Sequence, residues 1–142
     1  MKWLIALGIG ALLILLFIIP FPTHAQVASI TLDWTAPGDD GNVGTASSYE
    51  MRWSTSLPDT ANAAAMNAWW TAATPVAAMP TPTLAGSSQS KVVPGPFTTG
   101  ATYYFVMRAC DEVPNCSAFS NVASKFLPDS TPPARIIDLR VR

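Results

Sequence analysis

The chain of 142 residues is 49% hydrophobic and only 12% charged, with a formal net charge of −1 at pH 7. Its eight lysine and arginine residues are scattered rather than grouped. This argues against nucleic acid as a partner, because phosphate binding needs a basic stripe. A disordered chain is also disfavoured, since disorder is typical of a higher charge content.

Residues 1–25 have the composition of a secretory signal peptide. Lys2 supplies the positive start, a long apolar run follows, and Ala25 provides the small residue that signal peptidase requires. We therefore expect cleavage before Gln26 and a secreted protein, extracellular or on the cell surface. The alternative is an uncleaved membrane anchor, because Trp3–Phe21 approaches the length that crosses a bilayer core of about 30 Å.

Cys110 and Cys116 are the only cysteines, and five residues separate them. In a chain addressed to an oxidising compartment, this spacing predicts a disulfide that closes a loop. Zinc is a poor alternative, because the single histidine, His24, lies in the expected leader.

Alternating apolar and polar residues predict short strands after Gln26. In Ser29–Thr35, Ile30, Leu32 and Trp34 share one face, and a turn-rich segment then leads to a second strand at Tyr49–Ser54. Further strands are expected at Ser88–Val93, Thr102–Ala109 and Phe119–Leu127. The pattern predicts an all-β sandwich.

One alanine-rich stretch interrupts this pattern. We expect a short helix within Asp59–Trp70, with Asp59 or Thr60 as its N-cap, inserted over the sandwich.

Several segments together resemble a fibronectin type III domain of the bacterial secreted type. The likeness covers nearly all of Gln26–Leu127. Ile30–Gly41 is similar to strand B of the family, and Tyr49–Ser54 is similar to strand C. Phe97–Tyr103 is similar to the turn into strand F, and Ala109–Asn115 to the end of that strand and its loop. Ser120–Val122 is similar to strand G.

The resemblance implies an immunoglobulin-like sandwich in which Trp34 is the core tryptophan and Tyr103 forms a tyrosine corner. It also implies a non-enzymatic role in cell adhesion, spacing or protein contact, although a fold alone does not fix the function. Enzymatic activity is further disfavoured because the mature chain contains no histidine, phosphate loop or serine elbow.

The chain departs from the family pattern at both ends. Strand A is missing, because only Gln26–Ser29 precede the tryptophan strand, whereas Thr131–Arg142 resembles a linker followed by a strand A. We therefore expect residues 26–128 to form a sandwich that lacks strand A, and residues 129–142 to form a linker and a donor strand.

Such a donor strand is expected to complete the next copy by strand complementation, beside an acceptor strand that carries Ile30, Leu32 and Trp34. The contact is head-to-tail and predicts a homopolymeric filament whose partners are other copies of the chain. The side chains that fill the acceptor are Ile136 or Ile137, Leu139 and Val141, whereas Arg140 and Arg142 face outward.

Two alternatives remain at this stage. The chain could be a spacer or part of a longer multi-domain protein, the C-terminal segment beginning the next repeat. It could also be a protein-binding or carbohydrate-binding module that stacks sugars on Trp69 and Trp70, although adjacent helix residues do not share a face.

A calcium site is the one cofactor that the residues suggest. Asp39 and Asp40 are expected in one loop, and Asp111 and Glu112 in another loop at the same pole, so their oxygens could meet around the ion. The competing interpretation, which we favour, is that these are solvated turn residues that make local hydrogen bonds. We therefore expect no cofactor.

Overall fold

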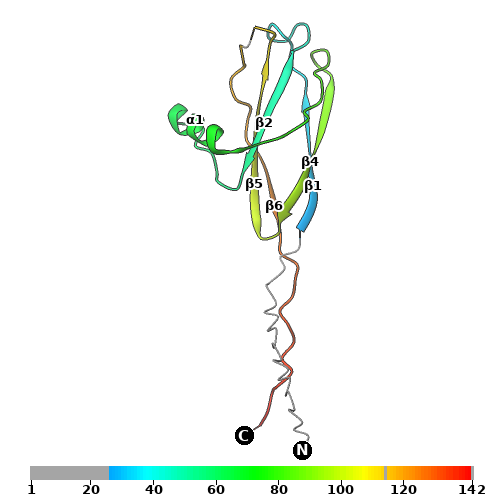
Figure 1. Ribbon diagram of the computed structural model, residues 1–142, viewed down its shortest axis with the longest axis vertical. Helices are drawn as coiled ribbons and strands as arrows, with labels where there is room; N and C mark the ends of the chain where they lie inside the picture. Colours follow the sequence, from blue (N-terminus) through cyan, green and yellow to red (C-terminus); the bar gives the residue numbers. More distant parts are fainter. Residues whose placement is uncertain (1–25, 114, 142) are drawn as a thin grey trace, which may run out of the picture.

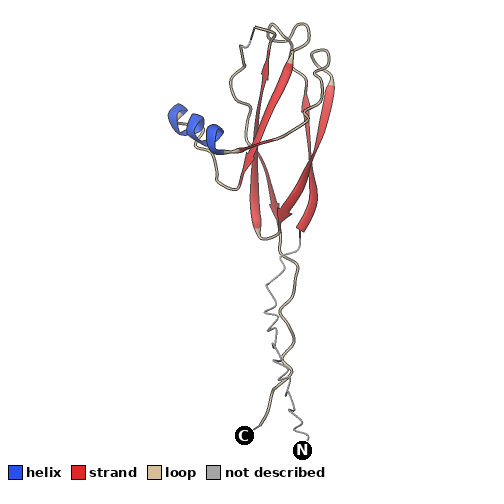
Figure 2. Ribbon diagram, viewed as in Figure 1, coloured by secondary structure: helices blue, strands red, loops and turns tan. Residues whose placement is uncertain are grey.

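The computed structural model describes residues 26–113 and 115–141, so the expected leader lies outside the described residues. Two antiparallel sheets face one another, and a short helix lies outside them, beside the larger sheet (Figures 1 and 2). The strand order is β1-β4 in one sheet and β3-β2-β5-β6 in the other. The expected all-β architecture is confirmed.

The smaller sheet pairs β1 (Gln26–Thr35) with β4 (Ser88–Thr98). Its register places Ile30 opposite Val93 and Trp34 opposite Gln89, with one irregularity between Val27 and Ser29. The alternation expected for β1 is confirmed, because Ile30 is buried while its neighbour Thr31 is exposed.

The larger sheet has β2 (Ser48–Ser54) and β5 (Ala101–Cys110) at its centre. Its edges are β3 (Thr74–Pro75) and β6 (Ala123–Leu127). Met51 pairs with Met107, so the apolar face of each central strand turns toward the smaller sheet.

The core lies between the two sheets. Its fully buried centre is Phe97, whose ring meets Trp53 and Tyr103 in edge-on contacts with centroid distances of 5.3 and 4.8 Å. The Tyr103 hydroxyl accepts a hydrogen bond of 2.8 Å from the backbone N–H of Thr98, five residues upstream. This bond ties the turn between β4 and β5 to the core, as a tyrosine corner does.

Helix α1 (Ala63–Ala72) begins later than the capping residues had suggested. Asn62 is the N-cap, because its side-chain oxygen accepts the N–H groups of Ala64 and Ala65. Asp59 instead closes a local turn by accepting the N–H of Ala61. Both expected caps were therefore wrong, while the helix itself is confirmed.

The helix covers the outer face of the larger sheet, where it builds a second apolar cluster around Val106. Met66, Trp69 and Trp70 are its buried residues. This explains why β5 is buried on both faces rather than on the one that alternation predicts. No helix in the described part of the chain is long and apolar enough to cross a membrane.

Strand boundaries differ most from the expectation in β1, β4 and β6, and the short β3 was not expected. β1 begins at Gln26 rather than at Ser29. β4 continues past Val93 to Thr98 although it contains Pro94 and Pro96, which an edge strand tolerates because one side of its ladder is unpaired. β6 begins only at Ala123, since Phe119 turns away to pack on Trp70 with a centroid distance of 4.8 Å.

Candidate strand-acceptor groove

The first feature of interest is the free edge of β1. Among the residues that the structure describes, β1 pairs with β4 on one side and with no strand on the other. The strand is ten residues long and contains neither proline nor lysine, the residues that commonly protect a sheet edge. Asp33 is its single charged residue. This edge therefore keeps the backbone groups needed to pair with a further strand.

The other edges are covered or short. β4 carries Pro94 and Pro96, and the segment 78–83 lies beside it. Gln89 donates to the carbonyl of Thr81 at 2.9 Å, and Lys91 donates to the carbonyl of Ala78 at 2.6 Å. β3 and β6 have only two and five residues. β1 is thus the long edge without protection.

A cleft opens between this free edge and the opposite sheet. One cavity of about 110 Å³ has Leu32 and Trp34 on one wall and Met107 and Ala123 on the other. Cavities of this order hold a ligand of benzene size, so one branched aliphatic side chain would fit. We name the cleft lined by these four residues the acceptor groove.

The cleft continues past Trp34 as a second cavity of about 360 Å³, beside Thr35 and Pro37. Tyr49 and Ala109 lie on its opposite side. The four residues that define the acceptor groove are only partly buried, although they pack against the main core. The groove is therefore an unfilled side of the core rather than a separate pocket.

Trp34 forms the rigid wall of the groove. Its ring meets Tyr49 edge-on at a centroid distance of 5.4 Å, and the Tyr49 hydroxyl donates to Gln89 at 2.6 Å. The indole N–H of Trp34 is buried and has no hydrogen-bond partner among the described residues. An unpaired buried donor costs about 1–3 kcal/mol. The Trp34 ring itself is therefore held by packing, including its contact with Tyr49, and not by a hydrogen bond of its own.

The second feature is the segment 128–141, which follows β6 and runs away from the sandwich (Figure 1). No strand pairing forms along it within the described residues. Ile136, Ile137, Leu139 and Val141 are between 77% and 100% exposed, although aliphatic side chains are normally buried. The segment therefore presents four apolar side chains that its own sandwich does not cover.

The start of β1 and the end of β6 lie at the same pole. Gln26 pairs with Thr98 and Ala101 pairs with Leu127, and these pairs flank one tight turn between β4 and β5. The expected donor residues thus leave from the pole where β1 begins (Figure 1). The acceptor groove lies toward the other end of β1, beside Leu32 and Trp34. The structure does not bring the two sets together within one chain.

The four acidic residues considered for calcium do gather at the opposite pole. Partial desolvation, followed by the negative charges of Glu112, Asp40 and Asp111, raises the pKa of Asp39 above its usual value. Asp111 is already engaged, because it accepts the N–H groups of Val113 and Asn115 and the side-chain amide of Asn115. These bonds lower its pKa. The contacts agree with the turn interpretation.

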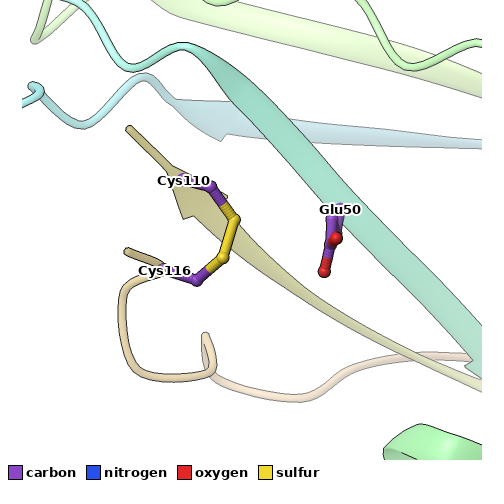
Figure 3. A group of neighbouring side chains, drawn as sticks. All are labelled: Glu50, Cys110 and Cys116. Carbon is purple, nitrogen blue, oxygen red and sulfur yellow. A yellow bond between two sulfur atoms is a disulfide. The ribbon is translucent and has the colours of Figure 1, made fainter. Parts of the chain in front are cut away.

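Cys110 and Cys116 form the expected disulfide. Glu50 lies beside them, and Figure 3 shows its carboxylate next to the bonded sulfur atoms. Because both sulfurs are held in the disulfide, neither is a thiolate able to bind a metal. Glu50 is instead paired with Arg108 at 2.7 Å. This group of residues closes a loop and is not a metal centre.

Trp69 and Trp70 are both buried, so this pair offers no exposed ring for sugar stacking. Trp69 donates its indole N–H to the carbonyl of Ser56 at 2.7 Å. The guanidinium groups of Arg52 and Arg108 lie 5.1 and 5.2 Å from the centre of the Trp70 ring. The suggested carbohydrate platform is therefore wrong, because the tryptophans build the contact between α1 and the sheet.

Sequence reasoning missed the far wall of the acceptor groove. Met107 lies within the strand expected at Thr102–Ala109 without being singled out, and Ala123 carries no pattern of its own. Their role depends on how the two sheets face each other, which strand periodicity does not encode.

Comparisons with protein-family models, with curated proteins and with solved structures find no match for the chain.

Proposed function

We propose that the protein is a secreted, non-enzymatic structural subunit that assembles head-to-tail by donating its C-terminal strand to the next copy. The observation that carries the proposal is the match between two unsatisfied features. β1 has a free edge beside an apolar groove, and residues 136–141 are an extended segment with exposed apolar side chains. Adding a strand to an exposed sheet edge is an established mode of recognition.

The strand order supports a fibronectin type III architecture without its first strand. With β1 taken as strand B, the orders β1-β4 and β3-β2-β5-β6 correspond to B-E and C′-C-F-G. In this family, strand A lies beside strand B, on the edge that is free here. The bond from Thr98 to Tyr103 is a further family-like feature.

Strand direction favours a second copy over the chain's own groove. The segment after Leu127 leaves the pole at which β1 begins, pointing away from the sandwich. Consider a second copy placed beyond this pole in the same orientation. The C-terminal end of the second copy's β1 would then be the end nearest to the arriving segment. The two strands would then run antiparallel without any reversal of the donor. Folding back would instead give parallel pairing, which is slightly less stable per residue.

The energetics depend on apolar burial. Each aliphatic side chain that becomes fully buried in the groove contributes about 1.5–3 kcal/mol, and the backbone ladder of β1 is completed as well. The linker contains Pro128, Pro132 and Pro133, which restrict the unbound segment and so reduce the entropy lost on docking. The Cys110–Cys116 disulfide supports an oxidising, extracellular location.

One substitution tests the proposal in the whole chain beginning at Gln26. Leu139→Asp places a charge on the donor, and Leu57→Asp is the matched control, because Leu57 is exposed in a loop away from the groove. We expect multimers of the unmodified chain and of the control on gel filtration, and monomers of Leu139→Asp. Assembly of Leu139→Asp at the same concentration as the unmodified chain would refute the proposal.

A peptide covering Thr131–Arg142 tests the groove itself. Added to the monomeric Leu139→Asp variant at about 100 times its Kd, it should raise the Tm by about 10 °C. A peptide that carries the same Leu139→Asp change is the control and should have no effect. If neither peptide shifts the Tm and the unmodified chain stays monomeric, the chain is a spacer or binding module instead.

A further inference from the structure

We propose that the donated strand docks in a single register, in which Arg140 of one copy lies opposite Asp33 of the next. This inference rests on the proposed function and identifies the residues that align the two strands. Antiparallel pairing alone leaves several registers open, and three observations select among them.

The first is alternation. Leu32 and Trp34 pack against the core, whereas Asp33 between them is exposed and borders the cleft at the free edge. Successive side chains of a strand point to opposite sides of the sheet, so Asp33 belongs to the outer face of β1. In the donor, Ile137, Leu139 and Val141 form one face, with Ile136, Asp138 and Arg140 on the other. The face with three aliphatic residues and no charge must turn inward. The permitted registers therefore differ by steps of two residues.

The second is the extent of the open cleft. The two cavities run along β1 from Leu32 to Pro37 and do not reach Ile30, which the core already buries. Val141 and Leu139 meet the two cavities when they lie opposite Leu32 and Trp34, which places Ile137 beside the buried Ala36, between Thr35 and Pro37 at the end of the cleft. Moving the donor two residues toward the start of β1 would place Val141 over Ile30, where no cavity remains.

The third is charge. Asp33 is the single charged residue of β1, and its side chain is exposed. The register that fits the cavities sets Arg140 opposite it, whereas the register shifted toward the start of β1 sets Asp138 there. Directly opposed unlike charges stabilise a strand pair, and like charges destabilise it. Charge thus disfavours the register that the cavities also disfavour. The opposite shift, which sets Arg142 opposite Asp33, leaves the cavity beside Leu32 unfilled.

The backbone agrees with this pairing. Ala36 donates its N–H to the carbonyl of Ser87 and accepts the N–H of Gly86, so its polar groups point toward β4. By alternation along the strand, the N–H and C=O of Thr35 and Asp33 point to the free edge. Asp33 and Arg140 would therefore exchange two backbone hydrogen bonds as well as facing one another.

Charge substitutions in the full chain separate the registers. In the proposed register, Asp33→Lys sets a second positive charge opposite Arg140 and should raise the concentration needed for assembly about 3- to 10-fold. Adding Arg140→Glu should restore it. In the shifted register, Asp33→Lys would face Asp138 and assembly would improve. Rescue by Arg142→Glu instead of Arg140→Glu would also overturn the inference, because the donor strand would then be shifted by two residues toward the C-terminal end of β1.

Cysteine pairs test the register directly. Asp33→Cys with Arg140→Cys in one chain should give covalent multimers on oxidation, since opposed strand residues lie about 5.5 Å apart, within disulfide range. Asp33→Cys with Asp138→Cys is the matched control and should not cross-link. Cross-linking of the control pair, or of neither pair in an assembling chain, refutes the register alone. A chain that never assembles refutes the proposed function as well.

Discussion

At the residue scale, two aspartates at one pole of the sandwich have pKa values shifted in opposite directions. Asp39 has a pKa raised by desolvation and by neighbouring carboxylates, whereas hydrogen bonds from Asn115 and Val113 lower the pKa of Asp111. A raised pKa in the folded state means that ionisation of Asp39 costs stability as the pH rises above its usual value of 3.8. A lowered pKa means that Asp111 stabilises the fold above that pH, and that this contribution is lost as the pH falls.

Matched substitutions of the two aspartates should change the free energy of unfolding in opposite directions. At pH 7, Asp39→Asn should raise the free energy of unfolding, because it removes a charge held among like charges. Asp111→Asn should lower it, because the charge-assisted bonds to the 111–115 loop weaken. As the pH falls below 3.8, Asp39→Asn should converge on the unmodified protein, and Asp111→Asn should converge only once the pH is below the lowered pKa of that carboxyl. Urea unfolding at both pH values measures the effect, and equal shifts for both variants at pH 7 would contradict the explanation.

At the element scale, alternation of apolar and polar residues predicted where the strands lie. The residues at which helices and strands begin and end depended on contacts between elements, which alternation does not contain. Ile30, Leu32 and Trp34 face the core as their spacing predicted. Val106 did not fit, because its burial under Trp70 comes from a helix inserted well before it in the chain. The groove was likewise expected only as a vacant edge. Its depth depends on how the two sheets face one another, which no local pattern contains.

The start of α1 illustrates a local choice that the sequence left open. Asp59, Thr60 and Asn62 are all good N-caps, and in the structure Asn62 caps α1 while Asp59 closes the turn before it. We expect Asn62→Ala to lower the free energy of unfolding by about 1 kcal/mol. Asn67→Ala, in the exposed helix interior, is the control and should be neutral or slightly stabilising. Equal destabilisation by both in thermal unfolding would show that the cap is elsewhere.

At the scale of the whole molecule, the sandwich has one free sheet edge, and residues 136–141 form an extended segment whose apolar side chains the sandwich does not cover. The groove beside β1 and the segment 136–141 are both apolar, and their directions allow antiparallel pairing between two copies. A head-to-tail contact of this kind does not close on itself unless rotation forms a ring, so it extends into a fibre. The exposed aliphatic residues, which would be a hazard in a monomer, are then part of the subunit contact.

The geometry also predicts the spacing of subunits. β1 rises about 3.3 Å per residue from Gln26 to Ala36, and the extended linker rises about 3.1 Å per residue from Leu127 to Ile137. If Ile137 lies opposite Ala36, consecutive subunits are separated by at most about 65 Å along the fibre.

Electron microscopy of the chain beginning at Gln26 is the most direct measurement of the central claim. We predict unbranched filaments with an axial repeat of at most about 65 Å, and their absence in the Leu139→Asp variant. Monodisperse single particles of the unmodified chain at high protein concentration would contradict the claim that the C-terminal strand completes a neighbouring copy.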